Sequence, residues 1–162
     1  MKVLKFGGTS VGSVENIQRV KEIVAAVSEP AVVVVSAVGG ITDKLIATTQ
    51  QAVNGTTTYT TQLDTIAQIH HNIIAGVVPA AMQAEVTEKV DTLLAEISTI
   101  LTSIEGIENL SSKDMDLVVS YGERMSSIIM AAVLNAQWWN SLDLIKTQQG
   151  AHKNVLDQAT TY

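Results

Sequence analysis

A lysine, a pair of glycines and two hydroxyl residues follow one another at the start of the chain. The stretch reads MKVLKFGGTSVG, and its residues with chemical potential are Lys5, Gly7, Gly8, Thr9 and Ser10. Glycine lets main-chain N–H groups approach an anion closely, and a helix that begins just beyond adds a favourable dipole. A lysine beside such N–H groups supplies a positive point charge. The stretch predicts a phosphate-binding turn between a strand and a helix. The alternative interpretation is a plain glycine-rich turn with Lys5 in solvent, because one glycine loop is a weak signal.

A second glycine turn follows the next apolar run. The run AVVVVSA at residues 31–37 predicts a strand buried on both faces, which is typical of a parallel sheet. The residues that follow or end it are Ser36, Gly39, Gly40, Thr42 and Asp43. Because ligands of open α/β sheets bind beyond the carboxyl ends of the strands, two neighbouring glycine turns predict a joint anion site. Alternatively, Thr42 or Asp43 is only the N-cap of the next helix.

A glycine beside two charged residues interrupts a helical pattern near residue 122. Gly122, Glu123 and Arg124 lie between the segment SSKDMDLVVS (111–120) and the apolar segment 128–134. Glycine in a helix costs about 1 kcal/mol relative to alanine, so its presence indicates that something approaches closely there. The alternative is a solvated Glu123–Arg124 pair beside a helix joint.

The remaining chain supplies the elements that hold these turns. Helical spacing predicts a helix from Val14 to about residue 28 with Ser13 as its N-cap, and another from residue 41 to about 53. Two amphipathic helices, about 60–76 and 79–104, predict an antiparallel hairpin that covers the sheet. A third strand is predicted over about 138–145, with a polar tail without regular elements from residue 147.

Composition narrows the class of protein. The 162 residues carry a net charge of −6, which argues against nucleic-acid binding, and the absence of cysteine excludes disulfides and thiolate metal sites. No signal peptide and no apolar run of about 20 residues is present, so we expect a cytoplasmic protein that is not embedded in a membrane. His70, His71 and His152 lack the spacing of metal ligands and are interpreted as surface or packing residues, so no metal site is predicted.

The three motifs together resemble a known family. KFGGTSV at residues 5–11, VVSA with GITD at residues 34–43, and SYGERMS at residues 120–126 are similar to the signatures of aspartokinases, in the amino-acid kinase family. The chain looks most like the amino-terminal part of the bifunctional aspartokinase–homoserine dehydrogenases. The resemblance covers nearly the whole chain and implies an α/β fold, a parallel-sheet αβα sandwich of which this is the helix-rich amino-terminal portion.

The resemblance also implies a reaction and residue roles. ATP and L-aspartate would give ADP and 4-phospho-L-aspartate, with Mg2+, at the start of the aspartate pathway to lysine, threonine and methionine. Lys5 would be catalytic and stabilise the transferring phosphoryl group. The phosphates would lie against Lys5, Gly7, Gly8, Thr9, Ser36, Gly39 and Gly40. Ser36 and Thr42 would hold carboxylate oxygens of aspartate, Glu123 would accept its ammonium group, and Ser10 and Arg124 would support the site.

The family's second glycine-rich nucleotide segment, its aspartate-binding arginine and its regulatory domains are expected to lie outside these 162 residues. We therefore expect that the chain alone has negligible kinase activity and that the longer parent is a homo-oligomer. Two other interpretations stay open: an amino-acid kinase acting on a different acid, and a non-catalytic phosphate-binding module.

Overall fold

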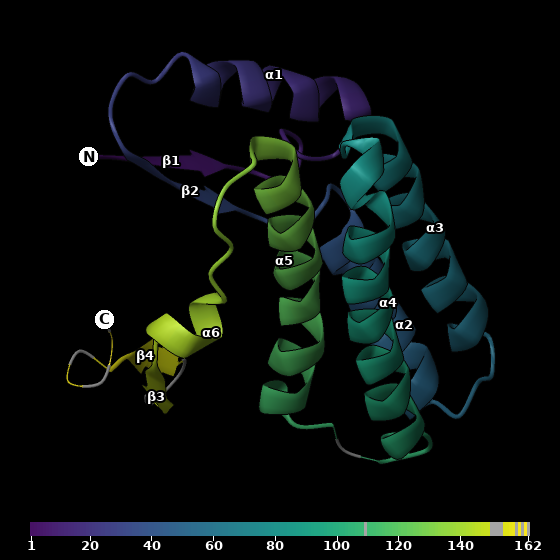
Figure 1. Cartoon of the computed structure of the whole chain (residues 1–162). Coiled ribbons are helices and arrows are strands. Elements are labelled where there is room, and N and C mark those ends of the chain that lie inside the picture. The colour runs from purple at the N-terminus through teal and green to yellow at the C-terminus, as the bar shows by residue number, and fades with distance from the viewer. Residues whose placement is uncertain (109, 150–153, 158, 160, 162) are drawn as a thin grey trace.

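The structure, a computed structural model, describes residues 1–108, 110–149, 154–157, 159 and 161. Within them the elements are β1 (Lys2–Phe6), α1 (Val14–Ala25), β2 (Ala31–Val35), α2 (Ile41–Val53), α3 (Tyr59–Val77), α4 (Ala80–Ser103), α5 (Ser112–Leu134), α6 (Ser141–Leu144), β3 (Thr147–Gln149) and β4 (Asn154–Leu156). Helices α2–α5 lie side by side, α1 crosses one end of them, and the sheet of β1 and β2 lies beside α5 (Figure 1).

Strands β1 and β2 pair in parallel, from Lys2 opposite Ala31 to Phe6 opposite Val35, which confirms the predicted β–α–β unit. The expected burial of β2 on both faces is wrong for this chain. Val32 and Val34 are 47% and 45% exposed. Side chains alternate along a strand, and α5, which contacts β2, covers one face of the two-stranded sheet.

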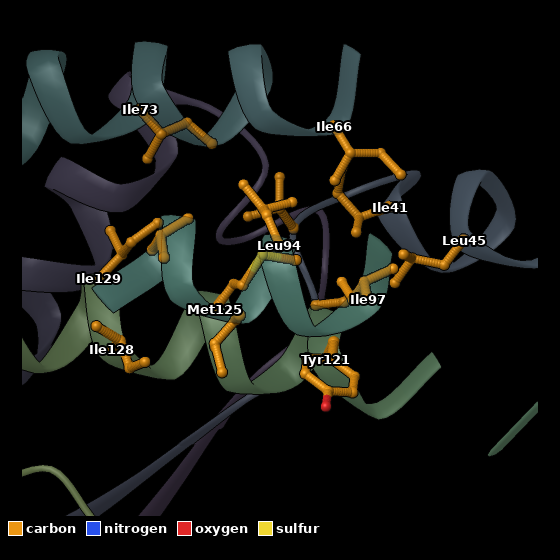
Figure 2. Close-up of a cluster of buried hydrophobic side chains, with 14 of the residues drawn as sticks. Ile41, Leu45, Ile66, Ile73, Leu94, Ile97, Tyr121, Met125, Ile128 and Ile129 are labelled. Carbon is orange, nitrogen blue, oxygen red and sulfur yellow. The ribbon is translucent and has the colours of Figure 1, made fainter. Parts of the chain in front are cut away.

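The core lies among the helices rather than against the sheet. Figure 2 shows its aliphatic side chains pointing inward from α2, α3, α4 and α5; among them are Ile41, Leu45, Ile66, Ile97, Met125 and Ile129. The predicted hairpin of α3 and α4 is confirmed as a pair of packed helices. Its predicted place over the sheet is wrong, because both helices turn their apolar sides toward α2 and α5.

Helix α5 is one continuous helix through Gly122, not two segments with a joint. The Ser111 hydroxyl caps it by accepting the Asp114 N–H. By length and composition α5 is apolar enough to cross a membrane, but 56% of its most apolar window is buried inside the molecule. A helix in the centre of a soluble core has this character, so α5 does not indicate a membrane protein.

The segment after α5 departs from the sequence predictions. The expected strand over residues 138–145 is wrong, because Ser141–Leu144 forms the short helix α6, capped by the Asn140 side chain. The expected irregular tail is also wrong, since β3 and β4 form an antiparallel pair. Polar Asn140 and Ser141 favour a helix start where the prediction required a strand.

Trp138 and Trp139 are 40% and 62% exposed. His152 lies outside the described residues.

Candidate phosphate and amino-acid site

Lys5 and Ser36, which belong to different sequence motifs, meet at the carboxyl ends of the two strands. Lys5 Nζ donates a hydrogen bond to Ser36 Oγ at 2.7 Å. The Ser36 N–H donates to the Phe6 carbonyl oxygen at 3.1 Å, which extends the pairing of β1 and β2 by one residue. The ammonium group of Lys5 is thereby held beside both glycine turns while its side chain remains exposed to solvent.

The two glycine turns contact each other backbone to backbone. A Cβ atom built on Gly8 would lie 3.0 Å from the Ala37 carbonyl oxygen, and one built on Gly39 would lie 3.2 Å from the Gly8 carbonyl oxygen. Side chains at these positions would force the turns apart, since such approaches are tighter than ordinary van der Waals contact. Glycine is therefore what allows the two turns to form one surface, as the parallel pairing of the strands predicts.

The first turn keeps some of its N–H groups free. It is closed by three internal hydrogen bonds: Ser10 N to Gly7 O, Val11 N to Gly7 O and Gly12 N to Thr9 O. The N–H groups of Gly8 and Thr9 make no backbone hydrogen bond within the described residues. Asn16, on α1, donates from Nδ2 to the Thr9 carbonyl oxygen at 2.9 Å and so fixes the far side of the turn. Free, fixed N–H groups of this kind bind anions.

The second turn is built by glycine conformation. Gly40 has a φ of 78°, a left-handed conformation that favours glycine, and α2 begins at the next residue without a side-chain cap. Thr42 and Asp43 lie inside the first turn of α2, so the alternative that either is the N-cap is wrong. The positive end of this 13-residue helix thus opens beside Gly39 and Gly40, with the half-buried Thr42 next to it.

Gly122 brings α5 to the second turn. A Cβ atom there would lie 2.8 Å from Ala37 Cβ and 3.4 Å from side-chain atoms of Ile41 and Leu45. The group predicted to approach this glycine closely is therefore another part of the same chain, at Ala37, Ile41 and Leu45. Glu123 follows, is half-buried, and has no hydrogen bond or ion pair within the described residues.

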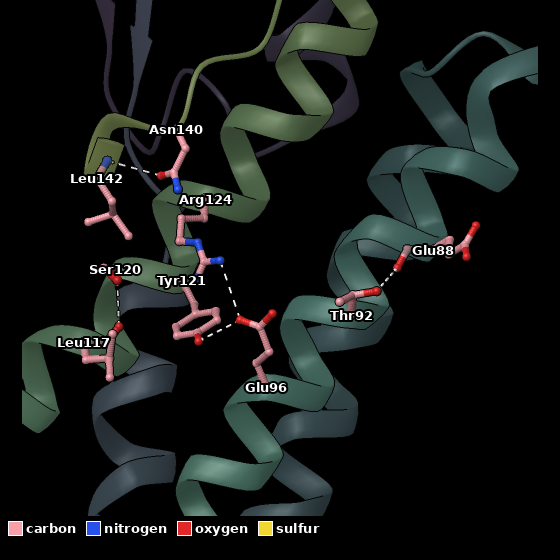
Figure 3. A network of polar contacts seen from close by, with 9 residues as sticks. All are labelled: Glu88, Thr92, Glu96, Leu117, Ser120, Tyr121, Arg124, Asn140 and Leu142. Atoms are coloured by element: carbon pink, nitrogen blue, oxygen red, sulfur yellow. Dashed lines mark hydrogen bonds and ion pairs between the residues drawn. The ribbon is translucent and has the colours of Figure 1, made fainter. Parts of the chain in front are cut away.

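Arg124 does not pair with Glu123, so the alternative of a solvated pair beside a helix joint is wrong. The Arg124 guanidinium lies over the Tyr121 ring, 4.3 Å from its centroid, and its Nη2 is 3.6 Å from Glu96 Oε2 on α4. Tyr121 donates to the same Glu96 oxygen at 2.8 Å (Figure 3). Burial raises the pKa of Tyr121, and the hydrogen bond to Glu96 adds to this.

Asn16 and Glu96 are the residues that the sequence interpretation missed. Asn16 sits three residues after the predicted cap Ser13, and its side chain gives no sign that it turns back to the loop. Glu96 lies 25 residues before Tyr121 in the chain, on an exposed part of a long amphipathic helix. Only the packing of α4 against α5 brings it to the motif.

Two hollows lie elsewhere on the molecule. One of about 440 Å³ is lined by residues of α2 and the start of α5, and one of about 180 Å³ lies between α4 and the end of α5. Within the described residues no group of three or more His, Cys, Asp or Glu side chains is placed to hold a metal ion. Neither hollow is lined by residues of the two glycine turns.

Residues 1–161 match the Amino acid kinase family, and the chain belongs to this family. Aspartokinase 1, chloroplastic, of Arabidopsis thaliana is 31% identical over 82% of this chain and 23% of its own length. Lysine-sensitive aspartokinase 3 of Escherichia coli is 30% identical over 90% of this chain and 32% of its own. The bifunctional aspartokinase/homoserine dehydrogenase 2 of E. coli is 28% identical over 98% of this chain and 20% of its own.

The solved structures agree with this assignment. E. coli aspartokinase III in complex with aspartate and ADP superposes with a TM-score of 0.85 and 26% identity, over 99% of this chain and 35% of that one. The resemblance to aspartokinases and the α/β fold expected from it are confirmed. The chain spans between about a fifth and a third of the length of the relatives named above.

Proposed function

We propose that this chain forms the phosphate- and aspartate-binding part of an aspartate kinase, which converts ATP and L-aspartate to ADP and 4-phospho-L-aspartate. The observation that carries the proposal is the Lys5–Ser36 contact at 2.7 Å, set between two glycine turns in backbone contact. The similar E. coli enzyme with aspartate and ADP bound supports both substrates.

Lys5 and the turns bind the phosphates. A carboxylate oxygen is already a nucleophile, so the reaction needs no strong base; it needs neutralised charge and in-line placement of two anions. The Lys5 ammonium group stabilises the charge on the transferring phosphoryl group. The backbone around it holds the remaining phosphate oxygens; this cradle consists of Gly7, Gly8, Thr9, Ser36, Gly39 and Gly40, with Ser10 in support.

The amino-acid substrate lies between the second turn and α5. Glu123 accepts the α-ammonium group, because its carboxylate has no partner within the described residues and follows Gly122, which contacts Ala37 of the turn. Ser36 and Thr42 donate their hydroxyls to the carboxylate oxygens. Arg124 supports this arrangement without touching the ligand, since it is held on the α4 side.

The site fits ATP at its phosphate end. Any Cβ on Gly8 or Gly39 would intrude on backbone, so the surface is shaped by the absence of side chains, as phosphate binding requires. Mg2+ bound with ATP would neutralise phosphate charge. Since no group of three or more acidic or histidine side chains among the described residues is placed to hold a metal ion, we propose that the phosphates would supply ligands to it.

We assign adenine binding and regulation to parts of the intact protein outside these 162 residues. The relatives are three to five times longer than the region matched here, and we assign the adenine-binding half and regulatory domains to such a longer chain. We propose that this protein is cytoplasmic, forms homo-oligomers and binds neither nucleic acid nor membranes. A fragment of these 162 residues should show negligible turnover.

Lys5→Ala in the intact enzyme tests the proposal. We expect kcat to fall by about 1,000-fold with an unchanged melting temperature, because Lys5 acts on charge that develops during transfer. Lys2→Ala is the matched control, since Lys2 lies on the same strand and pairs with Glu29 at 3.4 Å. Aspartate, glutamate and N-acetylglutamate are compared as acceptors. Unchanged kcat in Lys5→Ala, or preference for another acceptor, contradicts the proposal.

A further inference from the structure

Four consecutive residues of α5 face different surroundings. Gly122 contacts the second glycine turn, whereas Tyr121 and Arg124 reach Glu96 on α4. Glu123 lies between them and has no partner within the described residues. The helix therefore presents one free carboxylate beside the turn and keeps its neighbouring cation on another side.

Glu96 is the residue that holds this cation. Its Oε2 accepts the Tyr121 hydroxyl at 2.8 Å and lies 3.6 Å from Arg124 Nη2, while the guanidinium rests 4.3 Å from the Tyr121 ring centroid. The Arg124 side chain is only 19% exposed, so it lies along the helix surface instead of extending into solvent. Figure 3 shows the three side chains converging between α4 and α5.

Without Glu96 the guanidinium would have another acid to bind. Arg124 directly follows Glu123, and the Glu123 carboxylate is the nearest unpaired acidic group along the helix. Adjacent positions of a helix do not face each other, but a long arginine side chain released from Glu96 can swing toward the neighbouring carboxylate, to which it would be drawn by a charge-assisted hydrogen bond. Such a pair would occupy the group that the substrate's ammonium must reach.

We propose that Glu96 is a positioning residue: by holding Arg124 against Tyr121, it keeps the Glu123 carboxylate free for the ammonium group of the amino-acid substrate. This role rests on the proposed function. It adds a residue of α4 that lies outside all three sequence motifs and that acts through Arg124 rather than on the substrate itself.

Kinetics of the intact enzyme separate this role from a structural one. In Glu96→Ala we expect the KM for aspartate to rise about tenfold, with the KM for ATP changed less than about twofold. Adding Arg124→Ala should return the KM for aspartate to within about threefold of the wild-type value, because the competing cation is gone. Arg124→Ala alone should raise this KM less than Glu96→Ala does.

Two further variants control for folding and for surface charge. Glu96→Gln keeps an acceptor for the Tyr121 hydroxyl but loses the charge, so it should keep the wild-type melting temperature and still raise the KM for aspartate. Glu85→Ala removes another exposed carboxylate of α4, which pairs with Lys89 at 2.6 Å, and should leave both KM values unchanged. A double variant as impaired as Glu96→Ala, or an unchanged KM for aspartate in Glu96→Ala and Glu96→Gln, overturns the proposal.

A crystal structure of Glu96→Ala tests the positioning without relying on turnover. We expect the guanidinium within about 4 Å of the Glu123 carboxylate. A guanidinium that stays over the Tyr121 ring overturns the proposal. Absence of aspartate-dependent phosphoryl transfer in the wild-type enzyme instead contradicts the proposed function, and the position of Arg124 in this structure then still decides the role of Glu96.

Discussion

The glycine turns and the helical bundle are stabilised in opposite ways. The turns meet through backbone atoms, with Gly8 and Gly39 in contact and with Lys5 and Thr9 exposed. The bundle is filled by aliphatic side chains that are fully buried, such as Ile66 and Ile97. A site made of N–H groups requires the absence of side chains, whereas the core requires their volume. Substitutions in the two regions should therefore separate activity from stability.

Ile97→Ala should have the largest effect, and it should be on stability. Ile97 is 0% exposed, and removing its side chain leaves a cavity among α2–α5. We expect the free energy of unfolding to fall by about 2–5 kcal/mol, measured by urea titration. The KM values of the protein that remains folded should not change. A raised KM for ATP would show that the bundle and the turns are not independent.

Gly8→Ala should have the reverse effect. Its Cβ would lie 3.0 Å from the Ala37 carbonyl oxygen, so the turns must separate. We expect kcat/KM for ATP to fall about 100-fold, while the free energy of unfolding changes by less than about 1 kcal/mol. Steady-state kinetics and urea titration of the same preparation measure both. Near-normal kinetics would mean that the contact between the turns does not shape the site.

Gly40→Ala and Gly55→Ala sharpen the comparison with a matched pair. Both glycines have a left-handed φ, 78° and 67°, and a Cβ on either meets open space. Each substitution should lower the free energy of unfolding by about 1 kcal/mol through strain alone. Only Gly40→Ala should also raise the KM values, because Gly40 precedes the open end of α2. Equal KM values in the two variants would show that the second glycine turn is not part of the site.

Acidification should produce the smallest effect, confined to the bundle. His70 is fully buried; its Nδ1–H donates to the Ile66 carbonyl oxygen at 2.8 Å, and its Nε2 has no partner within the described residues. Burial lowers the pKa of His70. As the pH falls below about 6.5, the His70 imidazole is therefore protonated in the unfolded chain before it is protonated in the folded protein. The free energy of unfolding decreases as a result.

Urea titration at about pH 7.5 and about pH 5.5 measures this decrease, and the variant His70→Gln should show less of it. His71→Gln is the control, since His71 is on the same helix but pairs with Asp91 at 2.6 Å near the surface. If the decrease in the free energy of unfolding persists in His70→Gln and disappears in His71→Gln, it arises from His71, which contradicts the prediction.

The sequence predicted what local patterns determine. Ser13 as a cap, the parallel strands and the helices of the bundle follow from capping chemistry and periodicity, and Gly122 correctly indicated a close approach. The two glycine motifs also predicted that Lys5 and Ser36 lie close together, because parallel strands end at the same edge of a sheet.

Features that depend on packing could not be predicted. The exposure of Val32 and Val34 depends on what covers the sheet, and not on the β-branched run itself. Residues 138–145 contain enough apolar residues for a strand, but the cap at Asn140 favours a short helix. Glu96 reaches Tyr121 and Arg124 through the contact of α4 with α5, and no spacing along the chain encodes that contact.

The central claim is that Lys5, between the two glycine turns, binds the phosphates that face an amino acid held by Glu123. The most direct test is a crystal structure of the intact protein with ADP and aspartate bound. We expect phosphate oxygens within hydrogen-bond distance of Lys5 Nζ and of N–H groups from both turns, with the aspartate ammonium at Glu123. Phosphates bound away from Lys5, or Lys5 and Glu123 facing different ligands, would contradict the claim.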